Sequence, residues 1–113
     1  MVQEWATVSG DQHSFRILLI QPWTIDPEPI KRSLRLAGID AAITRVDFKA
    51  ALNAALANER FDATVFDSST PSLSRETIEA CFRLNGRQVR LVMLDDVTTL
   101  GTRLLAILES LKS

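Results

Sequence analysis

Four short, mostly apolar runs, each followed by a longer amphipathic segment, organise the sequence. Runs of this length are too short for helices, and they are typical of parallel strands buried on both faces. Strands that alternate with helices through short connections predict right-handed crossovers and a parallel sheet. The predicted strands are Phe15–Ile20, Ala41–Val46, Ala63–Phe66 and Val89–Leu94. The second alternates apolar and polar residues in part, which suits an edge strand with one face towards solvent.

The segments between these runs carry the signals of helix ends. The predicted helix starts are Asp26 with Pro27, Asp47, Ser72 or Ser74, and Asp95 with Asp96. Gly38 and the pair Asn85–Gly86 are placed to end helices in a left-handed conformation. The apolar positions at helical spacing are Ile30, Leu34, Ala37; Phe48, Leu52, Ala55, Leu56; Ile78, Cys81, Phe82; and Leu100, Leu104, Ile107, Leu108, Leu111.

Length and composition predict one globular domain over residues 15–113, after a polar tail or linker over residues 1–14. Thirteen basic and 14 acidic side chains leave a net charge of −1, so no overall field attracts nucleic acid or anionic lipid. The single Cys81 excludes an internal disulfide, and no apolar run approaches the roughly 18 residues that span a bilayer. We therefore expect a cytoplasmic protein without membrane or nucleic-acid partners.

The third predicted strand ends abruptly in a carboxylate, Asp67, which is followed by turn-forming residues up to Pro71. In an open α/β sheet, ligands bind beyond the carboxyl ends of the strands, which makes Asp67 a candidate functional group. The alternative is that Asp67 only stabilises the turn that follows it.

The order of elements, the strand Asp62-Ala63-Thr64-Val65-Phe66-Asp67 and the proline at position 71 resemble a response-regulator receiver domain of the CheY-like family. The resemblance runs from about Arg16 to Ser113. It implies a flavodoxin-like, doubly wound parallel sheet in three α/β/α layers. It also implies that Asp67 holds the phosphoacceptor position and that Pro71 shapes the loop beside it. With about four strands and four helices, the family's fifth strand and the lysine before it have no counterpart.

Two departures from the family pattern concern this same edge of the sheet. Gln21-Pro22 stands where receivers have the acidic pair that holds Mg²⁺, and Asp95 stands where they have Thr or Ser. Neutral Gln21 and Pro22 offer little to the divalent cation that phosphoryl transfer requires. A carboxylate at Asp95 would repel a phosphoryl group on Asp67. We therefore expect no catalysis and no cofactor. The pocket around Asp67 would contain Gln21, Pro22, Trp23, Ser68, Pro71, Asp95 and Asp96.

Three features of the sequence leave alternatives open. Asp67, Asp95 and Asp96 form a rearranged metal cluster, or the last two only begin the final helix. Trp23 packs against the domain or anchors a partner. The remaining feature is a set of arginines that is either a patch for a phosphate-bearing second messenger or a solvated face: Arg75, Arg83, Arg87 and Arg90.

The function that these observations favour is a degenerate receiver that acts as a protein-interaction module in two-component signalling. Its partner would be a histidine kinase or another domain of a multidomain signalling protein. The alternatives are a working receiver phosphorylated on Asp67 and a domain that binds a nucleotide second messenger. Without a fifth strand, Val89–Leu94 would present an open edge or be covered by a displaced last helix. This arrangement predicts a homodimer, with interface residues Leu100, Leu104, Leu108 and Leu111.

Overall fold

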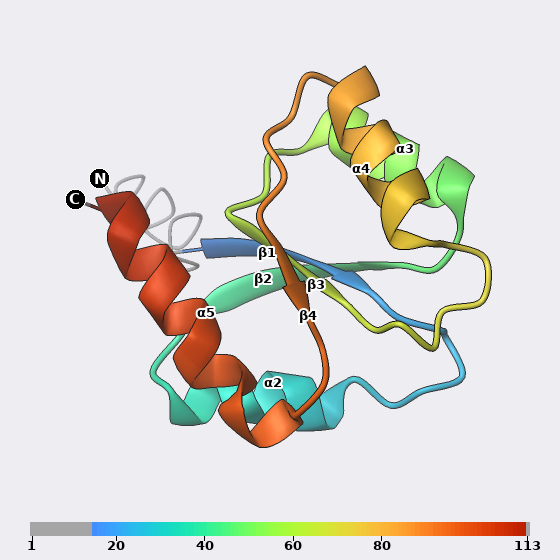
Figure 1. The fold of residues 1–113 in the computed structure, drawn as a ribbon. Helices are drawn as coiled ribbons and strands as arrows, with labels where there is room; N and C mark the ends of the chain where they lie inside the picture. The colour runs from blue at the N-terminus through green and yellow to red at the C-terminus, as the bar shows by residue number, and fades with distance from the viewer. Residues whose placement is uncertain (1–14, 113) are drawn as a thin grey trace, which may run out of the picture.

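The computed structural model describes residues 15–112, with side chains for residues 15–110, so the tail predicted over residues 1–14 lies outside the described part. Four parallel strands form one sheet in the order β2-β1-β3-β4 (Figure 1). The elements are β1 (Phe15–Ile20), α2 (Glu28–Leu36), β2 (Ala41–Val46), α3 (Lys49–Asn58), β3 (Ala63–Phe66), α4 (Arg75–Leu84), β4 (Leu91–Met93) and α5 (Val97–Lys112). The predicted doubly wound α/β fold is confirmed.

The sheet separates two apolar cores. Helices α2 and α5 cover one face, and α3 and α4 cover the other (Figure 1). Successive residues of β1 point alternately to the two sides, so Ile17 and Leu19 join the first core while Leu18 and Ile20 join the second. This double burial explains why β1 is apolar without interruption.

The last helix returns to the face that α2 covers. The crossovers from β2 to β3 and from β3 to β4 run in the same direction across the sheet, so right-handedness places α3 and α4 on one face. A further crossover beyond β4 would use that face again, whereas α5 packs beside α2 on the other (Figure 1). Within the described residues, no strand therefore pairs with the outer edge of β4, and α5 does not cover that edge. Of the two predicted arrangements, this is the open edge.

This placement corrects the predicted interface. Leu100, Leu104 and Leu108 have no exposed surface, because they fill the core between α5, α2 and the sheet. Fully buried side chains cannot contact a second chain, so these three leucines belong to the domain's own core. The side chain of Leu111 lies outside the described residues.

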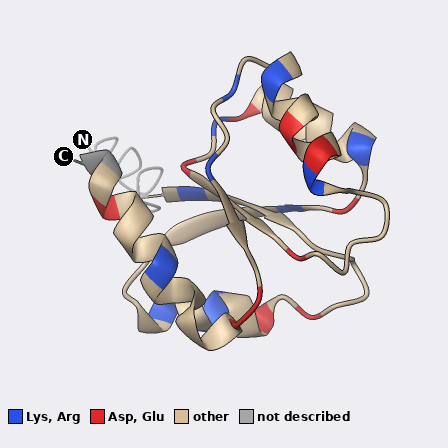
Figure 2. Cartoon of the chain, viewed as in Figure 1, with Lys and Arg blue, Asp and Glu red and all other residues tan. Residues whose placement is uncertain are grey.

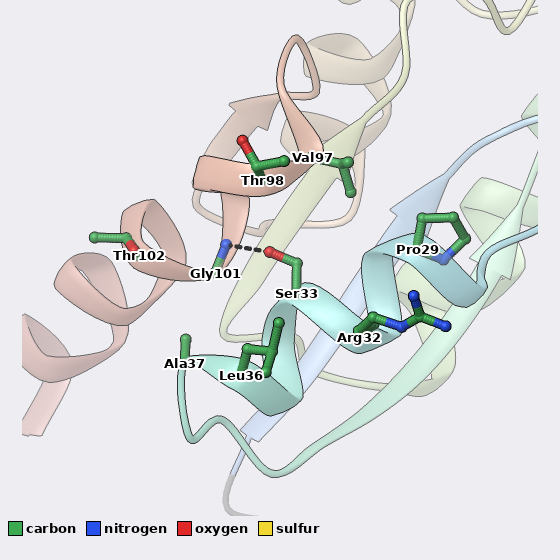
Figure 3. Close-up of a pocket in the computed structure, with 9 residues that line it drawn as sticks. All are labelled: Pro29, Arg32, Ser33, Leu36, Ala37, Val97, Thr98, Gly101 and Thr102. Carbon is green, nitrogen blue, oxygen red and sulfur yellow. Dashed lines mark hydrogen bonds between the residues drawn. The ribbon is translucent and has the colours of Figure 1, made fainter.

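Helices α2 and α5 approach each other closely at one point. The amide of Gly101 donates a hydrogen bond of 3.0 Å to Ser33 Oγ (Figure 3). A Cβ atom at position 101 would overlap the carbonyl oxygen of Ser33 and would lie 2.9 Å from the Ala37 Cβ. Glycine at position 101 is therefore required by the spacing of the two helices.

Three of the predicted helix boundaries are confirmed, one by a capping bond and two by backbone conformation. Ser74 Oγ accepts the amide of Thr77 at 3.2 Å and begins α4. Gly38 and Gly86 end their helices with φ values of 77° and 65°, which glycine adopts without steric cost.

The prediction that Asp47 caps the second helix is wrong. The N-cap of α3 is Phe48, and its side chain makes no capping bond. Asp47 instead accepts the amide of Trp23 at 3.4 Å, which ties the loop after β1 to the end of β2. Phe48 was expected on the inward stripe of this helix, but half of its surface is exposed. The start of α2 differs only slightly from expectation, since Asp26 accepts the Glu28 amide at 3.0 Å and the helix begins at Glu28.

Candidate functional site

Asp67 lies at the carboxyl end of β3 and shapes the turn that follows. Its Oδ1 accepts both the amide of Ser69 at 2.9 Å and the Ser69 hydroxyl at 2.7 Å. The hydroxyl of buried Thr70 donates to the Asp67 carbonyl at 2.7 Å. The turn-stabilising role considered for Asp67 is therefore present, and one carboxylate oxygen is fully engaged in it.

The other carboxylate oxygen of Asp67 faces the end of the neighbouring strand. In the parallel register Ile20 pairs with Phe66, so Gln21 and Asp67 leave their strands at the same level. Gln21 is 2% exposed, and its Nε2 donates a long hydrogen bond of 3.4 Å to Asp67 Oδ2. Gln21 and Asp67, which the sequence predicts at one site, are therefore in contact.

Arg45 of β2 completes the polar cluster from the other side. Its guanidinium donates to the Ile25 carbonyl at 2.7 Å and to the Trp23 carbonyl at 3.3 Å. Its Nη1 also lies 3.5 Å from Gln21 Oε1. A fixed cation therefore stands behind Gln21, and the order of contacts across the sheet edge is Arg45, Gln21, Asp67.

Trp23 lies above this cluster and stays exposed. The guanidinium carbon of Arg45 is 4.2 Å from the centroid of the Trp23 ring, a cation–π geometry. Trp23 nevertheless stays 59% exposed, and Phe48, next in the chain to the Asp47 that binds the Trp23 amide, is also exposed. Of the remaining predicted pocket residues, Pro22 is half-buried, and Ser68 and Pro71 are exposed.

Asp95 and Asp96 serve the last helix. Asp96 Oδ1 accepts the hydroxyl of Thr98 at 2.7 Å and its amide at 3.0 Å, and these two bonds lower the pKa of the Asp96 carboxyl. Asp95 Oδ1 pairs with Arg103 at 2.8 Å, and Arg103 also donates to the Met93 carbonyl at 3.0 Å. The carboxylate of Asp95 is therefore directed to Arg103, and no contact among the described residues joins it to Asp67, so the expected repulsion of a group on Asp67 is not supported.

These contacts decide whether the site suits the Mg²⁺ of a receiver. Within the described residues, no group of three or more His, Cys, Asp or Glu side chains is arranged to hold a metal ion. Among the described residues, Asp67 is the one carboxylate that contacts Gln21, and Arg45 opposes a second cation there. The residues present do not fit Mg²⁺, and the rearranged cluster of Asp67, Asp95 and Asp96 is not formed.

The arginines considered as one patch are dispersed. Arg75 pairs with Glu79 at 3.1 Å, and Arg83 is exposed on α4. Arg87 and Arg90 line a separate hollow at the other end of the sheet.

The sequence analysis missed two features: the position of Arg45 at the site, and a hollow between α2 and α5. The register pairs Arg45 with Leu19, one residue before both strands end, and this position is the signal that could have located Arg45. An apolar hollow of about 360 Å³ lies between α2 and α5 beside exposed Leu36 (Figure 3).

Across the described part of the chain, no helix is long and apolar enough to cross a membrane.

No family model matches the chain, and no curated protein matches it. Among solved structures it is similar to the receiver domain of a sensor histidine kinase from Pseudomonas aeruginosa PAO1, determined with a magnesium ion coordinated in its active-site cleft. The identity is 25% with a TM-score of 0.56, over 79% of this chain and 73% of that one. Together with the strand order, this similarity shows that the chain has a CheY-like receiver fold and supports a receiver-like role in two-component signalling.

Proposed function

We propose that the domain is a degenerate receiver of two-component signalling, which acts through protein contacts and takes no phosphoryl group on Asp67. The observation that carries the proposal is the engagement of Gln21, whose amide nitrogen faces Asp67 and whose amide oxygen faces Arg45. Phosphoryl transfer to a carboxylate needs a divalent cation to neutralise the developing charge. At this edge Asp67 receives a hydrogen bond from the Gln21 amide, and the Arg45 guanidinium lies behind Gln21 where a receiver would hold its metal.

Mg²⁺ with beryllofluoride should leave the amide chemical shifts of Gln21, Asp67 and Ser69 unchanged at millimolar metal. The physical reason is that Arg45 and the Gln21 amide group exclude a hydrated dication from Asp67. Two-dimensional NMR of the labelled chain measures this directly. Saturable shifts that disappear in Asp67→Asn would instead establish the working receiver phosphorylated on Asp67.

The exposed aromatic side chains beside the site support a protein partner. Trp23 and Phe48 are 59% and 50% exposed, and the bond between the Trp23 amide and Asp47 holds their two loops together. Large aromatic residues and arginine are typical anchors of protein interfaces. The partner in this proposal is a histidine kinase or another domain of a cytoplasmic multidomain signalling protein.

We further propose that two chains associate through the outer edge of β4. Backbone bonds alternate along a parallel strand, so residues next to each other face opposite sides. The Thr64 amide donates to the Arg90 carbonyl and the Leu94 amide to the Phe66 carbonyl, which directs Arg90 and Leu94 towards β3. The backbone groups of Leu91 and Met93 therefore face outward, where Arg103 already binds the Met93 carbonyl.

Light scattering after size exclusion should give the wild-type chain the mass of two chains at micromolar concentration. Leu91→Pro should give the mass of one chain, because proline removes the outward N–H of β4 and leaves its bonds to β3. Leu91→Ala is the matched control, since it shortens the same side chain and keeps the N–H. A monomeric wild-type chain, or loss of the dimer in Leu91→Ala as well, would refute pairing through this edge.

A further inference from the structure

A second hollow lies at the end of the sheet opposite Asp67, where β3 and β4 begin. It measures about 310 Å³. The residues that bear on its chemistry are Arg60, Phe61, Phe82, Gly86, Arg87 and Arg90, and the lining also includes the carboxylate of Glu59. They come from the connection between α3 and β3 and from the connection between α4 and β4. Figure 2 shows basic positions, in blue, along the connection between α4 and β4.

In the part of the chain that the structure describes, the three arginines of this hollow have no acidic partners. Arg87 Nε donates to the Leu56 carbonyl at 3.0 Å, and Arg90 donates to Gln88 Oε1 at 3.2 Å. Among the described residues, none of the three forms an ion pair with a carboxylate. Like charges that line one hollow repel each other, so the hollow favours an anion.

Two carboxylates lie near this hollow, and both contact Arg16. Its side chain pairs with Glu59 at 3.0 Å, and its backbone amide donates to Asp62 Oδ2 at 2.8 Å. The Arg16 side chain offsets the charge of Glu59, and Asp62 does not line the hollow, so the three guanidinium groups leave a net positive charge there, although the chain as a whole has a net charge of −1.

The hollow also has an apolar wall and a volume that suit a ligand larger than a single ion. The bond from Arg87 to the last turns of α3 holds that guanidinium in place, and its two terminal nitrogens have no partner in the described residues. Buried Phe82 and half-buried Phe61 supply an apolar wall. Gly86 turns the chain at positive φ with open space in the direction of a Cβ. The volume reaches the lower end of the range of small-ligand pockets, roughly 300–1,000 Å³.

We propose that this hollow binds the phosphate group of a small organic phosphate of about mononucleotide size. Guanidinium groups match phosphate oxygens in charge and in geometry, and the apolar wall can hold the remainder of such a ligand. The site lies away from Asp67, so it does not depend on whether Asp67 is ever modified.

The test is an NMR titration of the full chain with guanosine 5′-monophosphate, with guanosine and inorganic phosphate as separate arms. The nucleotide should shift the amides of Gly86, Arg87 and Arg90 saturably, with a dissociation constant of about 1 mM or below. Guanosine at the same concentration should leave them unchanged. Inorganic phosphate should move the same amides. Absence of saturable shifts with the nucleotide up to about 10 mM would overturn the proposal.

Arg60→Ala is the informative variant, because Arg60 is exposed and forms no ion pair within the described residues, so its replacement should leave the fold intact. Removing one charge-assisted bond to phosphate should weaken nucleotide binding about tenfold. Arg83→Ala is the matched control, since Arg83 is exposed, lies outside the hollow and also lacks an ion pair. Equal weakening by both variants would reveal unspecific charge attraction and overturn the site.

Discussion

Leu104→Glu should abolish folding of the domain. Leu104 is 0% exposed in the core between α5, α2 and the sheet, so a carboxylate at this position loses its water without gaining a partner. Truncation of a buried leucine to alanine alone costs about 2–5 kcal/mol, a large part of the roughly 5–15 kcal/mol that stabilises a small domain. Far-UV circular dichroism and urea unfolding should show no cooperative transition for this variant.

The matched control for this prediction is Leu84→Glu. Leu84 is a leucine of α4 with 78% of its surface exposed, so the same substitution should leave the circular dichroism spectrum and the unfolding midpoint nearly unchanged. A Leu104→Glu chain that folds normally and differs only in its association state would contradict the buried position of α5. It would return Leu104 to the surface of the domain.

Gly101→Ala should lower the free energy of unfolding by about 2–3 kcal/mol, in the range measured for overpacked sites. The added methyl group would overlap the Ser33 carbonyl and crowd the Ala37 side chain. Because the overlapped atom belongs to the backbone, no side-chain rotation relieves it, and the two helices have to separate. The loss should exceed the gain of about 1 kcal/mol that alanine brings to a helix interior in place of glycine.

Thr102→Ala provides the control for this second prediction. Thr102 is the next residue of the same helix and is exposed, so its replacement should be neutral or slightly stabilising in urea unfolding. If Gly101→Ala proved as stable as Thr102→Ala, helices α2 and α5 would have to lie further apart than the Gly101–Ser33 bond indicates.

The strands and helices were predictable because their signals are local. The apolar run Phe15–Ile20 predicts a strand buried on both faces from its own residues alone. Ser74 and Gly86 mark the two ends of α4 through a capping bond and a positive φ, which depend only on neighbouring residues. The face covered by α5 was not predictable. Its apolar stripe shows that one side is buried, but the handedness rule applies only to a helix that leads to another strand of the sheet.

The candidate site was predicted in part for the same reason. Gln21 and Asp67 each follow a strand, and parallel strands end at one edge, so their meeting follows from the order of elements. Arg45 was missed because an arginine within an edge strand is usually solvated. Its role depends on where the loop after β1 places the carbonyl groups of Trp23 and Ile25. The Asp47 cap failed because the Trp23 amide takes that carboxylate instead.

The contact between Arg45 and Gln21 limits the order in which mutations could rebuild a metal-binding receiver from this chain. An acidic residue introduced at position 21 alone would meet the guanidinium that now lies 3.5 Å from Gln21 Oε1. The two would form an ion pair, and the new carboxylate would be neutralised before it could serve a metal. Arg45 has to be replaced first or at the same time. If the proposed degenerate role holds, a metal site at Asp67 would therefore require changes at positions 21 and 45 together, because a substitution at position 21 alone leaves no free carboxylate for the metal.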